Sequence, residues 1–488
     1  MDAHPVRWVF VVGLVFTLAL LNVKLFAGSG PWWRGWADQK AYLESARAFG
    51  ALDLSPGRHW YPLVYPLLAA PFAWLLAAPF VPANLACFGL AFAGFRSVAG
   101  RFGIGGAGAL VLFLATTLLD PAVAPRWLEP WTTTLSAALV WPALALTGAL
   151  IFRERLGPGR AALLGALLAL IPLTRPADLI VTAALAPFIL WRADWRERGI
   201  GLGAGLAILL LYLGLHLAIY GARWSDYVLL SRAYGLNFGD LAFKAQVLLV
   251  DARGWFPGGK SLLEAMPWLF FAALGFALGG FTLRGPARML WVCMALVATS
   301  YTLVLIAYVD LLPTGMWRFN NIHYFKWLLP MAGLGIVRLW QDAPGHRRTG
   351  LAIAALLFAA TLFHLQPVPA GEHSPARALR FAAAPQPWAE IYMARSAIAD
   401  ARGIQRNFFD YHQIPDGGRG VLAVALKRPF EGDARWIGNP PLNLADWPRG
   451  SPGQRAALAG PFPRHPYARL TGRWTLGPPC WLIAPLCD

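Results

Sequence analysis

A series of apolar stretches constrains the fold of this chain more than any other feature. The first stretch runs from Trp8 to Ala27, and the series continues to residue 366. A transmembrane helix needs about 20 apolar residues, so the series predicts a protein that crosses a membrane many times. Hydrophobic residues make up 57% of the chain and charged residues only 14%, which excludes a soluble enzyme. We therefore expect an all-α, multi-pass integral membrane protein.

The predicted number of spans is about eleven. Residues 62–79 are left out of this number because four prolines interrupt them, which favours an interfacial or re-entrant helix over a full span. The other apolar runs give spans near residues 8–27, 82–98, 104–119, 132–152, 160–174, 179–191, 200–220, 267–283, 289–309, 326–341 and 349–366.

Basic residues in the loops predict the orientation. If the N-terminus lies in the cytoplasm, thirteen arginines fall in short inner loops and four basic residues fall in short outer turns. Lys and Arg concentrate on the cytoplasmic side of membrane proteins, so this orientation is favoured and suits a bacterial inner membrane. It also explains the net charge of +17 without nucleic-acid binding. The inner arginines are Arg96, Arg101, Arg153, Arg155, Arg160, Arg192, Arg196, Arg198, Arg284, Arg288, Arg338, Arg347 and Arg348.

The chain divides by composition into a transmembrane core, residues 1–366, and a tail, residues 367–488. The tail contains 17 of the 39 prolines, and charges interrupt its apolar runs before they reach spanning length. We expect a small, loop-rich extracytoplasmic domain, with strands in the runs at 420–426 and 480–486. Cys480 and Cys487 are the two cysteines that we expect to form a disulfide there, whereas Cys87 and Cys293 lie in apolar runs.

The first outer loop combines tryptophans with an acidic residue. Trp32, Trp33 and Trp36 suit the headgroup region of the membrane. Asp38 follows them and starts a predicted amphipathic helix. One face of this helix is expected to rest on lipid, with the carboxylate turned outward or into a cleft. The residues of that face are Tyr42, Ala46 and Phe49.

Basic residues in the short outer turns break the charge bias, so they require another explanation. Arg has a planar fork that suits phosphate oxygens, and Lys and His add point charges. Such residues are costly at membrane depth unless they are paired or bind a ligand. We expect a cationic ring that faces Asp38 and binds a lipid-linked phosphate. Its members are Arg126, beside Glu129; Arg175, near Asp178; and Arg318, His323 and Lys326 in WRFNNIHYFKW.

Taken in order along the chain, these motifs resemble the GT-C superfamily of integral-membrane glycosyltransferases. The resemblance covers roughly residues 8–341 and excludes the tail. Two positions depart from the usual pattern: Gln39 stands where many members have a second acid, and Leu128 precedes Glu129 where a small residue is usual. The matching motifs are WADQKAYL in the first outer loop, HWYPLVYPLLAAPF, LEPWTTTL, PLTRPADL and WRFNNIHYFKWLLP.

The resemblance implies a polyprenyl-phosphate sugar as donor and a lipid, glycan or protein hydroxyl as acceptor. Asp38 would act as the catalytic base or would orient the acceptor in an inverting displacement. The basic residues would bind the donor phosphate. The resemblance implies no certain cofactor. No zinc motif is present, and a divalent metal stays open because of the two departures. Residues expected to support the site are Gln39, Tyr42, Glu129 and Asp178.

Other interpretations compete with this one. A transporter or a flippase for lipid-linked sugars is the main alternative, although the sequence lacks the internal repeat typical of transporters. A non-catalytic scaffold that presents the tail is another. Individual residues also have structural explanations. Asp38 can cap a helix, Glu129 can be a first-turn acid of the following span, Arg175 can simply pair with Asp178, and Arg318 and Lys326 can extend to the membrane surface.

Overall fold

The computed structural model describes residues 5–26, 37–76, 78–120, 123–234, 236, 238, 241, 245–250, 261–308, 321–343 and 345, together with five short segments of the tail. Two compact units divide the chain. The first unit comprises residues 1–231, 269–305 and 322–348, and the second comprises residues 232–268, 306–321 and 349–488. The first unit holds most of the predicted site.

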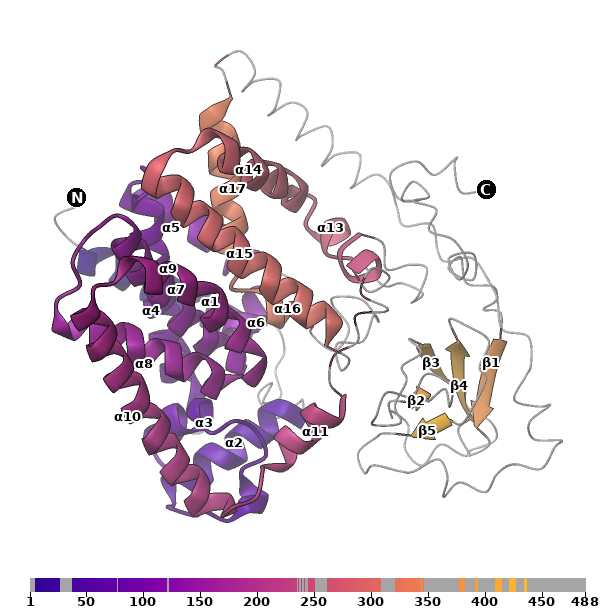
Figure 1. Ribbon diagram of the computed structural model, residues 1–488. Helices are drawn as coiled ribbons and strands as arrows, with labels where there is room; N and C mark the ends of the chain where they lie inside the picture. Colours follow the sequence, from indigo (N-terminus) through magenta and orange to yellow (C-terminus); the bar gives the residue numbers. More distant parts are fainter. Residues whose placement is uncertain are drawn as a thin grey trace, which may run out of the picture. The chain divides into compact units, whose positions relative to one another are not determined.

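Helices dominate the first unit (Figure 1). They are α1 (Pro5–Phe26), α2 (Ala37–Gly50), α3 (Val64–Ala69), α4 (Phe80–Gly100), α5 (Gly106–Ala115), α6 (Ala124–Leu128), α7 (Thr132–Ile151), α8 (Pro158–Thr174), α9 (Leu179–Arg192), α10 (Trp195–Tyr220), α11 (Asp226–Tyr234), α14 (Trp268–Thr282), α15 (Gly285–Ala307), α16 (Ile322–Phe325) and α17 (Leu329–Asp342). The first residue of α14 and the last residues of α11 and α15 belong to the second unit, which also holds α13 (Leu262–Ala265) and the π-helical turn η5 (Gln246–Val250).

Ten of the eleven predicted spans coincide with a helix in the described residues, and the eleventh, 349–366, lies outside them. Four of these helices are long and apolar enough to cross a membrane, namely α4, α7, α10 and α15. Shorter apolar helices include α5, α8 and α14. The described part of residues 62–79 contains the short helix α3 and the 3₁₀ turn η3 (Ala70–Phe72) and no longer helix, as the prolines predict. The chain is therefore a mostly helical integral membrane protein.

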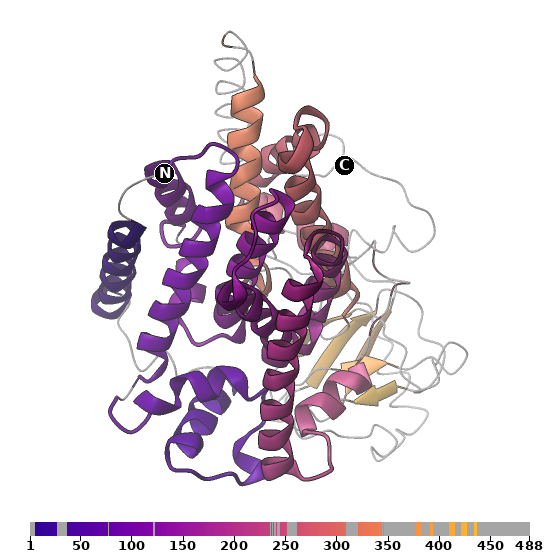
Figure 2. The same cartoon turned by 60° about the vertical axis from the view of Figure 1, so that its left-hand side comes forward.

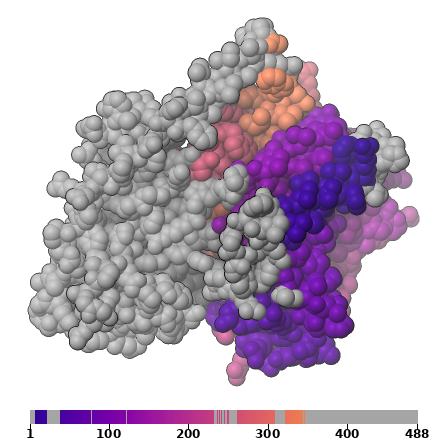
Figure 3. Space-filling model, turned by 180° about the vertical axis from the view of Figure 1, so that it is seen from behind, coloured from indigo at the N-terminus to yellow at the C-terminus, as the bar shows by residue number. Residues whose placement is uncertain are grey.

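Helix α7 forms the centre of the first unit. In the apolar stretch of α7, 94% of the residues are buried within the protein, whereas the corresponding share is 6% in α10 at the periphery. It packs against α4, α8 and α9. A glycine allows the closest approach: a Cβ on Gly94 of α4 would lie 2.4 Å from the backbone of Trp141 in α7. Helix α1 lies at the edge of the bundle, and several of its leucines are exposed (Figures 2 and 3).

Small residues also bring α8 and α10 together. A Cβ on Gly165 would lie 1.9 Å from the main-chain oxygen of Gly201, so the two backbones touch. Helix α10 begins with a capping box. The Glu197 amide donates to Asp194 Oδ1 at 2.8 Å, and the Asp194 amide donates to Glu197 Oε2 at 2.9 Å.

The amphipathic helix predicted to start at Asp38 is present as α2, but its apolar face does not lie on lipid. Tyr42, Ala46 and Phe49 are 3%, 0% and 7% exposed within the protein itself. Phe49 packs with Leu63, Ala70 and Ile219, so α10 and the segment after α2 cover this face. Figure 1 shows α2, α3 and α11 gathered at one end of α10. Periodicity correctly predicted a buried face, and only the surface expected to cover it was wrong.

The described part of the tail consists of strands. β1 (Arg377–Phe381), β4 (Val421–Leu426) and β3 (Phe409–Ile414) form an antiparallel sheet in that order. β2 (Ile391–Met393) pairs with β5 (Ala434–Trp436). The strand expected in residues 420–426 is β4. The run at 480–486, both cysteines of the predicted disulfide and the predicted boundary after residue 366 lie outside the described residues.

Candidate active site

The centre of the candidate site is the break between α6 and α7. Helix α6 ends at Leu128, and Glu129 has an extended backbone with φ −69° and ψ 152°. Pro130 follows, and it has no N–H to continue the helix. Because α7 begins only at Thr132, Glu129 is not a first-turn acid of that span, which corrects the structural explanation given above.

Two buried side chains hold this break from outside. Asn84 of α4 donates from Nδ2 to the main-chain oxygens of Leu128 and Glu129, both at 3.1 Å. Its Oδ1 accepts from the Tyr65 hydroxyl at 2.8 Å, and the same hydroxyl accepts from the Trp131 amide at 3.1 Å. The main-chain oxygens of Leu128 and Glu129 and the amide of Trp131 thus find hydrogen-bond partners in the protein interior, although no helix satisfies them.

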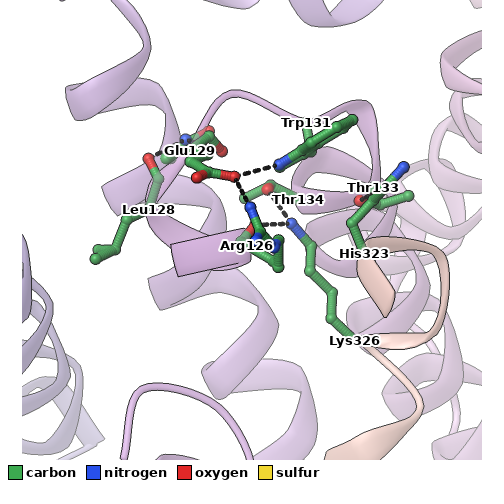
Figure 4. A network of polar contacts seen from close by, with 9 residues as sticks. Arg126, Leu128, Glu129, Trp131, Thr133, Thr134, His323 and Lys326 are labelled. Atoms are coloured by element: carbon green, nitrogen blue, oxygen red, sulfur yellow. Dashed lines mark hydrogen bonds and ion pairs between the residues drawn. The ribbon is translucent and has the colours of Figure 1, made fainter. Parts of the chain in front are cut away.

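The Glu129 carboxylate is fixed by its neighbours in sequence (Figure 4). Its Oε2 accepts from Arg126 Nη1 at 2.5 Å and from Trp131 Nε1 at 3.0 Å. The Arg126–Glu129 ion pair is partly buried. Both side chains are therefore oriented in advance, which suits a binding site more than a solvated surface.

Lys326 reaches the same break from the turn that follows α16. It is fully buried, at 0% exposure. Its Nζ donates to the main-chain oxygen of Arg126 and to Thr134 Oγ1, both at 2.6 Å (Figure 4), and lies 5.0 Å from the ring centre of Trp127. These hydrogen-bond partners are neutral oxygens. Within the part of the chain that the structure describes, Lys326 has no carboxylate within 4.0 Å.

His323 lies one turn before Lys326 and packs against the same segment. Its ring stacks on Trp131 at 3.9 Å, and its Nδ1 is 3.2 Å from Thr133 Oγ1. Burial lowers the pKa of His323 well below its usual value of 6.5, and nearby cations, Arg175 first, lower it further. His323 is therefore neutral at pH 7. This corrects the expectation that it adds a point charge.

Arg175 and Asp178 form a second buried group between α8 and α9. Arg175 Nη1 lies 3.1 Å from Asp178 Oδ1 and donates to the Tyr301 hydroxyl at 3.0 Å. Asp178 Oδ2 accepts from Ser136 Oγ at 2.6 Å. Burial raises the pKa of Asp178, whereas Arg175 and Ser136 oppose that rise. The guanidinium also lies 4.8 Å from the ring centre of Tyr324, which is next to His323 in sequence. The second group therefore adjoins the first.

Asp38 lies in the first turn of α2 and is partly buried. Its Oδ1 accepts from the Tyr61 hydroxyl at 2.5 Å. Burial raises the pKa of Asp38 above its usual 3.8, and the Tyr61 hydrogen bond partly offsets that rise. Tyr42 connects this carboxyl to the other groups, because its ring packs on Tyr61 and its hydroxyl interacts with Thr132 at the start of α7.

The structure thus brings Arg126, Glu129, His323 and Lys326 into one network, with Arg175 and Asp178 adjoining it. Gln39 is buried in α2. Arg318 and the tryptophans Trp32, Trp33 and Trp36 lie outside the described residues. In the part of the chain that the structure describes, no group of three or more His, Cys, Asp or Glu side chains could hold a metal ion.

Comparisons with known proteins give one structural match. No protein-family model matches the chain, and no curated protein matches it. Among solved structures, the chain is similar to the crystal structure of ArnT from Cupriavidus metallidurans bound to undecaprenyl phosphate. The TM-score is 0.45 and the sequence identity is 16%. The match covers 75% of this chain and 66% of that chain, slightly less than two thirds of its length.

Several residues of the network were not predicted from the sequence. Asn84 stands as a single amide in an apolar run, which is a signal for a functional or structural role inside a membrane protein. Tyr301 gives no such signal, because Thr299, Ser300 and Thr302 surround it in the sequence. Tyr61 and Tyr65 belong to the Tyr-Pro-rich segment, but nothing in the sequence identifies their partners. Thr134 carries no signal, since threonine is common in apolar helices.

Proposed function

We propose that this protein is a membrane glycosyltransferase that moves a sugar from a polyprenyl-phosphate donor to an acceptor hydroxyl. The observation that carries the proposal is Lys326, a fully buried amine held by neutral oxygens. Burying a cation without a directly bonded counter-charge is costly, and the Glu129 carboxylate interacts with Lys326 only without such a bond. A bound phosphate would supply that charge, and it would lie beside the oriented Arg126–Glu129 pair.

In the proposed reaction, Lys326 and Arg126 hold the donor phosphate. An oxygen of the acceptor attacks the anomeric carbon from the opposite side, and its proton goes to Asp38. The bond between the anomeric carbon and the phosphate oxygen breaks, and its electron pair stays on that oxygen. Polyprenyl phosphate then leaves, with its added negative charge stabilised by the cations. The product has the inverted anomeric configuration.

The proposal includes the orientation predicted from the loops. The N-terminus would lie in the cytoplasm, and the site would face the outer side of a bacterial inner membrane. Support comes from the bias of thirteen inner arginines against four outer basic residues. Two of those four, Arg126 and Lys326, contact each other in the network, as expected if function rather than topology keeps them there.

The acid dependence of transfer follows from the pKa of Asp38. A base must be deprotonated to accept a proton, and burial raises the pKa of this carboxyl. Transfer should therefore fall as the pH drops through a value above 3.8, the usual pKa of aspartate, and should be constant well above it. A pH–rate profile measures this fall in rate on the acidic side, which is the acid limb of the profile.

The decisive experiment compares Asp38→Asn with Asp53→Asn in purified protein, using polyprenyl-phosphate donors that carry one hexose or pentose. The amide cannot accept the hydroxyl proton, so Asp38→Asn should lower transfer by about two to four orders of magnitude. Asp53 is the matched control, because its carboxylate is exposed and bonds Ser55 of its own loop. Asp53→Asn should retain normal transfer.

Two results would contradict the proposal. Near-normal transfer by Asp38→Asn would remove Asp38 from the chemistry. Movement of intact donor across a vesicle bilayer, without transfer to any acceptor, would favour the flippase alternative over an enzyme. The proposal has two parts, a phosphate site at Lys326 and a base at Asp38. A donor-binding measurement with Lys326→Met separates them, because it tests the phosphate site alone.

A further inference from the structure

Tyr61 makes the hydrogen bond that orients Asp38. Its hydroxyl donates to Asp38 Oδ1 at 2.5 Å from a segment 23 residues away in sequence. The Tyr61 ring itself packs against two other tyrosines, Tyr42 with ring centres 4.7 Å apart and Tyr227 of α11 with ring centres 5.1 Å apart. A hydroxyl on a ring that packs against two other rings is a more fixed donor than one on an exposed ring.

We propose that Tyr61 is the positioning residue for the carboxylate of Asp38: it holds Oδ1 and leaves Oδ2 to face the acceptor hydroxyl. This inference rests on the proposed function of Asp38. A carboxylate has two oxygens, and one fixed hydrogen bond to the first determines where the second points. An aspartate in the first turn of a helix would otherwise turn freely toward solvent or the helix amides.

The surroundings of the carboxyl support this role. Among the described residues, the titratable groups that interact with it are the hydroxyls of Tyr61 and Tyr42, and Tyr227 interacts with both of these tyrosines. Burial raises the pKa of the Tyr42 phenol well above its usual 10, and Arg175 is close enough to oppose part of that rise. Burial is the main cause of the raised pKa of Asp38, and the hydrogen bond from Tyr61 is the interaction that lowers it. Removing that hydroxyl should therefore raise the pKa further.

The test is the pH–rate profile of Tyr61→Phe. A hydrogen bond to a charged group is worth enough to move a pKa by about one to two pH units, so the acid limb should shift upward by that amount. At a pH on the wild-type limb, transfer should fall about ten- to a hundredfold. At alkaline pH, where Asp38 is ionised in both proteins, much of this loss should be recovered. A merely structural defect would lower transfer equally at every pH.

Tyr220→Phe is the matched control. It also deletes one tyrosine hydroxyl that bonds the same segment, at the main-chain oxygen of His59, but it does not touch Asp38. It should leave the acid limb where it is in the wild type. An unmoved limb in Tyr61→Phe, or an equal shift in Tyr220→Phe, would overturn the inference.

A second measurement needs no turnover, and so separates failure of this inference from failure of the proposed function. Infrared spectroscopy can titrate the carboxyl of Asp38 directly, with the band assigned by its absence in Asp38→Asn. The midpoint of this titration should rise in Tyr61→Phe.

If Tyr61→Phe does not fold, 3-fluorotyrosine at position 61 keeps the ring. Its more acidic phenol is a stronger donor, so the midpoint should fall. A midpoint that moves in neither protein would exclude the positioning role.

Discussion

The positive charge of the site depends on individual residues in different ways. Arg126 pairs with Glu129, and Arg175 pairs with Asp178. His323 is kept neutral by burial, with Arg175 as the next contribution to its lowered pKa. Lys326 contacts neutral oxygens. Among the described cations of the site, Lys326 is therefore the one without a carboxylate bonded to it, although Glu129 interacts with it at longer range, and the charge that meets a phosphate should come chiefly from it.

This difference predicts unequal effects on donor affinity. Lys326→Met should weaken the binding of a polyprenyl phosphate about tenfold or more, because a charge-assisted hydrogen bond contributes about 1.5–3 kcal/mol. His323→Asn should change the affinity less than about threefold, since it removes no charge at pH 7. Calorimetric titration of the purified variants measures both. Equal losses in the two variants would show that His323 is charged after all.

The sequence predicted part of this site because some of its residues violate the rule that basic residues concentrate in cytoplasmic loops. Arg126 and Lys326 were found because basic residues are unexpected in short outer turns, and Glu129 because it neighbours one of them. Asn84 breaks an apolar run but gives no indication of its partners, and Tyr65 and Thr134 violate no comparable rule. Their importance comes from partners 44 to 192 residues away, which only the packing of the helices brings into contact.

At the scale of elements, the break between α6 and α7 depends on a side chain from another helix. Asn84 satisfies two main-chain oxygens and accepts from Tyr65. Asn84→Leu leaves those groups buried without partners, which should destabilise the protein by about 1–3 kcal/mol for each group left unpaired. Donor affinity should fall too, because Glu129 and Trp131 are no longer fixed.

Thr147→Val provides the control for this variant. Thr147 is also buried in a central helix, but its hydroxyl has no hydrogen-bond partner in the described structure. Its replacement by the isosteric valine should leave both thermal stability and donor affinity unchanged. If Asn84→Leu behaves like Thr147→Val in thermal unfolding and in donor titration, Asn84 does not support the break.

The contact between α8 and α10 makes a second prediction at this scale. Gly165→Ala would place a methyl group 1.9 Å from a main-chain oxygen of Gly201, so the helices must separate, at a cost of about 1–3 kcal/mol. Gly203→Ala is matched to it, because a Cβ there meets nothing within 4 Å and alanine favours helix. Thermal unfolding in detergent should show a loss for the first variant alone. A similar midpoint for both would mean that the two backbones do not pack this closely.

Elements were more predictable than their contacts. Apolar length and proline content were enough to find ten helices and to exclude a full span at residues 62–79. The face of α2 was also found from its periodicity. What covers that face was not predictable, because periodicity reports that a surface is buried and carries no information about its partner. Phe49 would have the same spacing whether it met lipid or Ile219.

At the scale of the whole molecule, the loop charges predict on which side each segment lies. The short inner loops and the tail should face opposite sides of the membrane. A reporter enzyme that is active only in the cytoplasm should be inactive when fused after Asp488. The same reporter inserted at residues 153–157, between α7 and α8, should be active. Activity after Asp488 would overturn the predicted orientation.

The cysteines give an independent measure of the same topology. Cys87 and Cys293 are buried in α4 and α15 and are free thiols. Cys480 and Cys487 would meet an oxidising environment only if the tail lies outside the cytoplasm, and the short loop between them allows a disulfide. Thiol labelling of denatured, unreduced protein should therefore find two free thiols per chain, and four after reduction. Four free thiols before reduction would argue against both the disulfide and an oxidising location for the tail. A Cys480→Ser variant should show three free thiols before reduction instead of two, because Cys487 then has no partner within its own chain. This variant separates the predicted pair from a disulfide between chains.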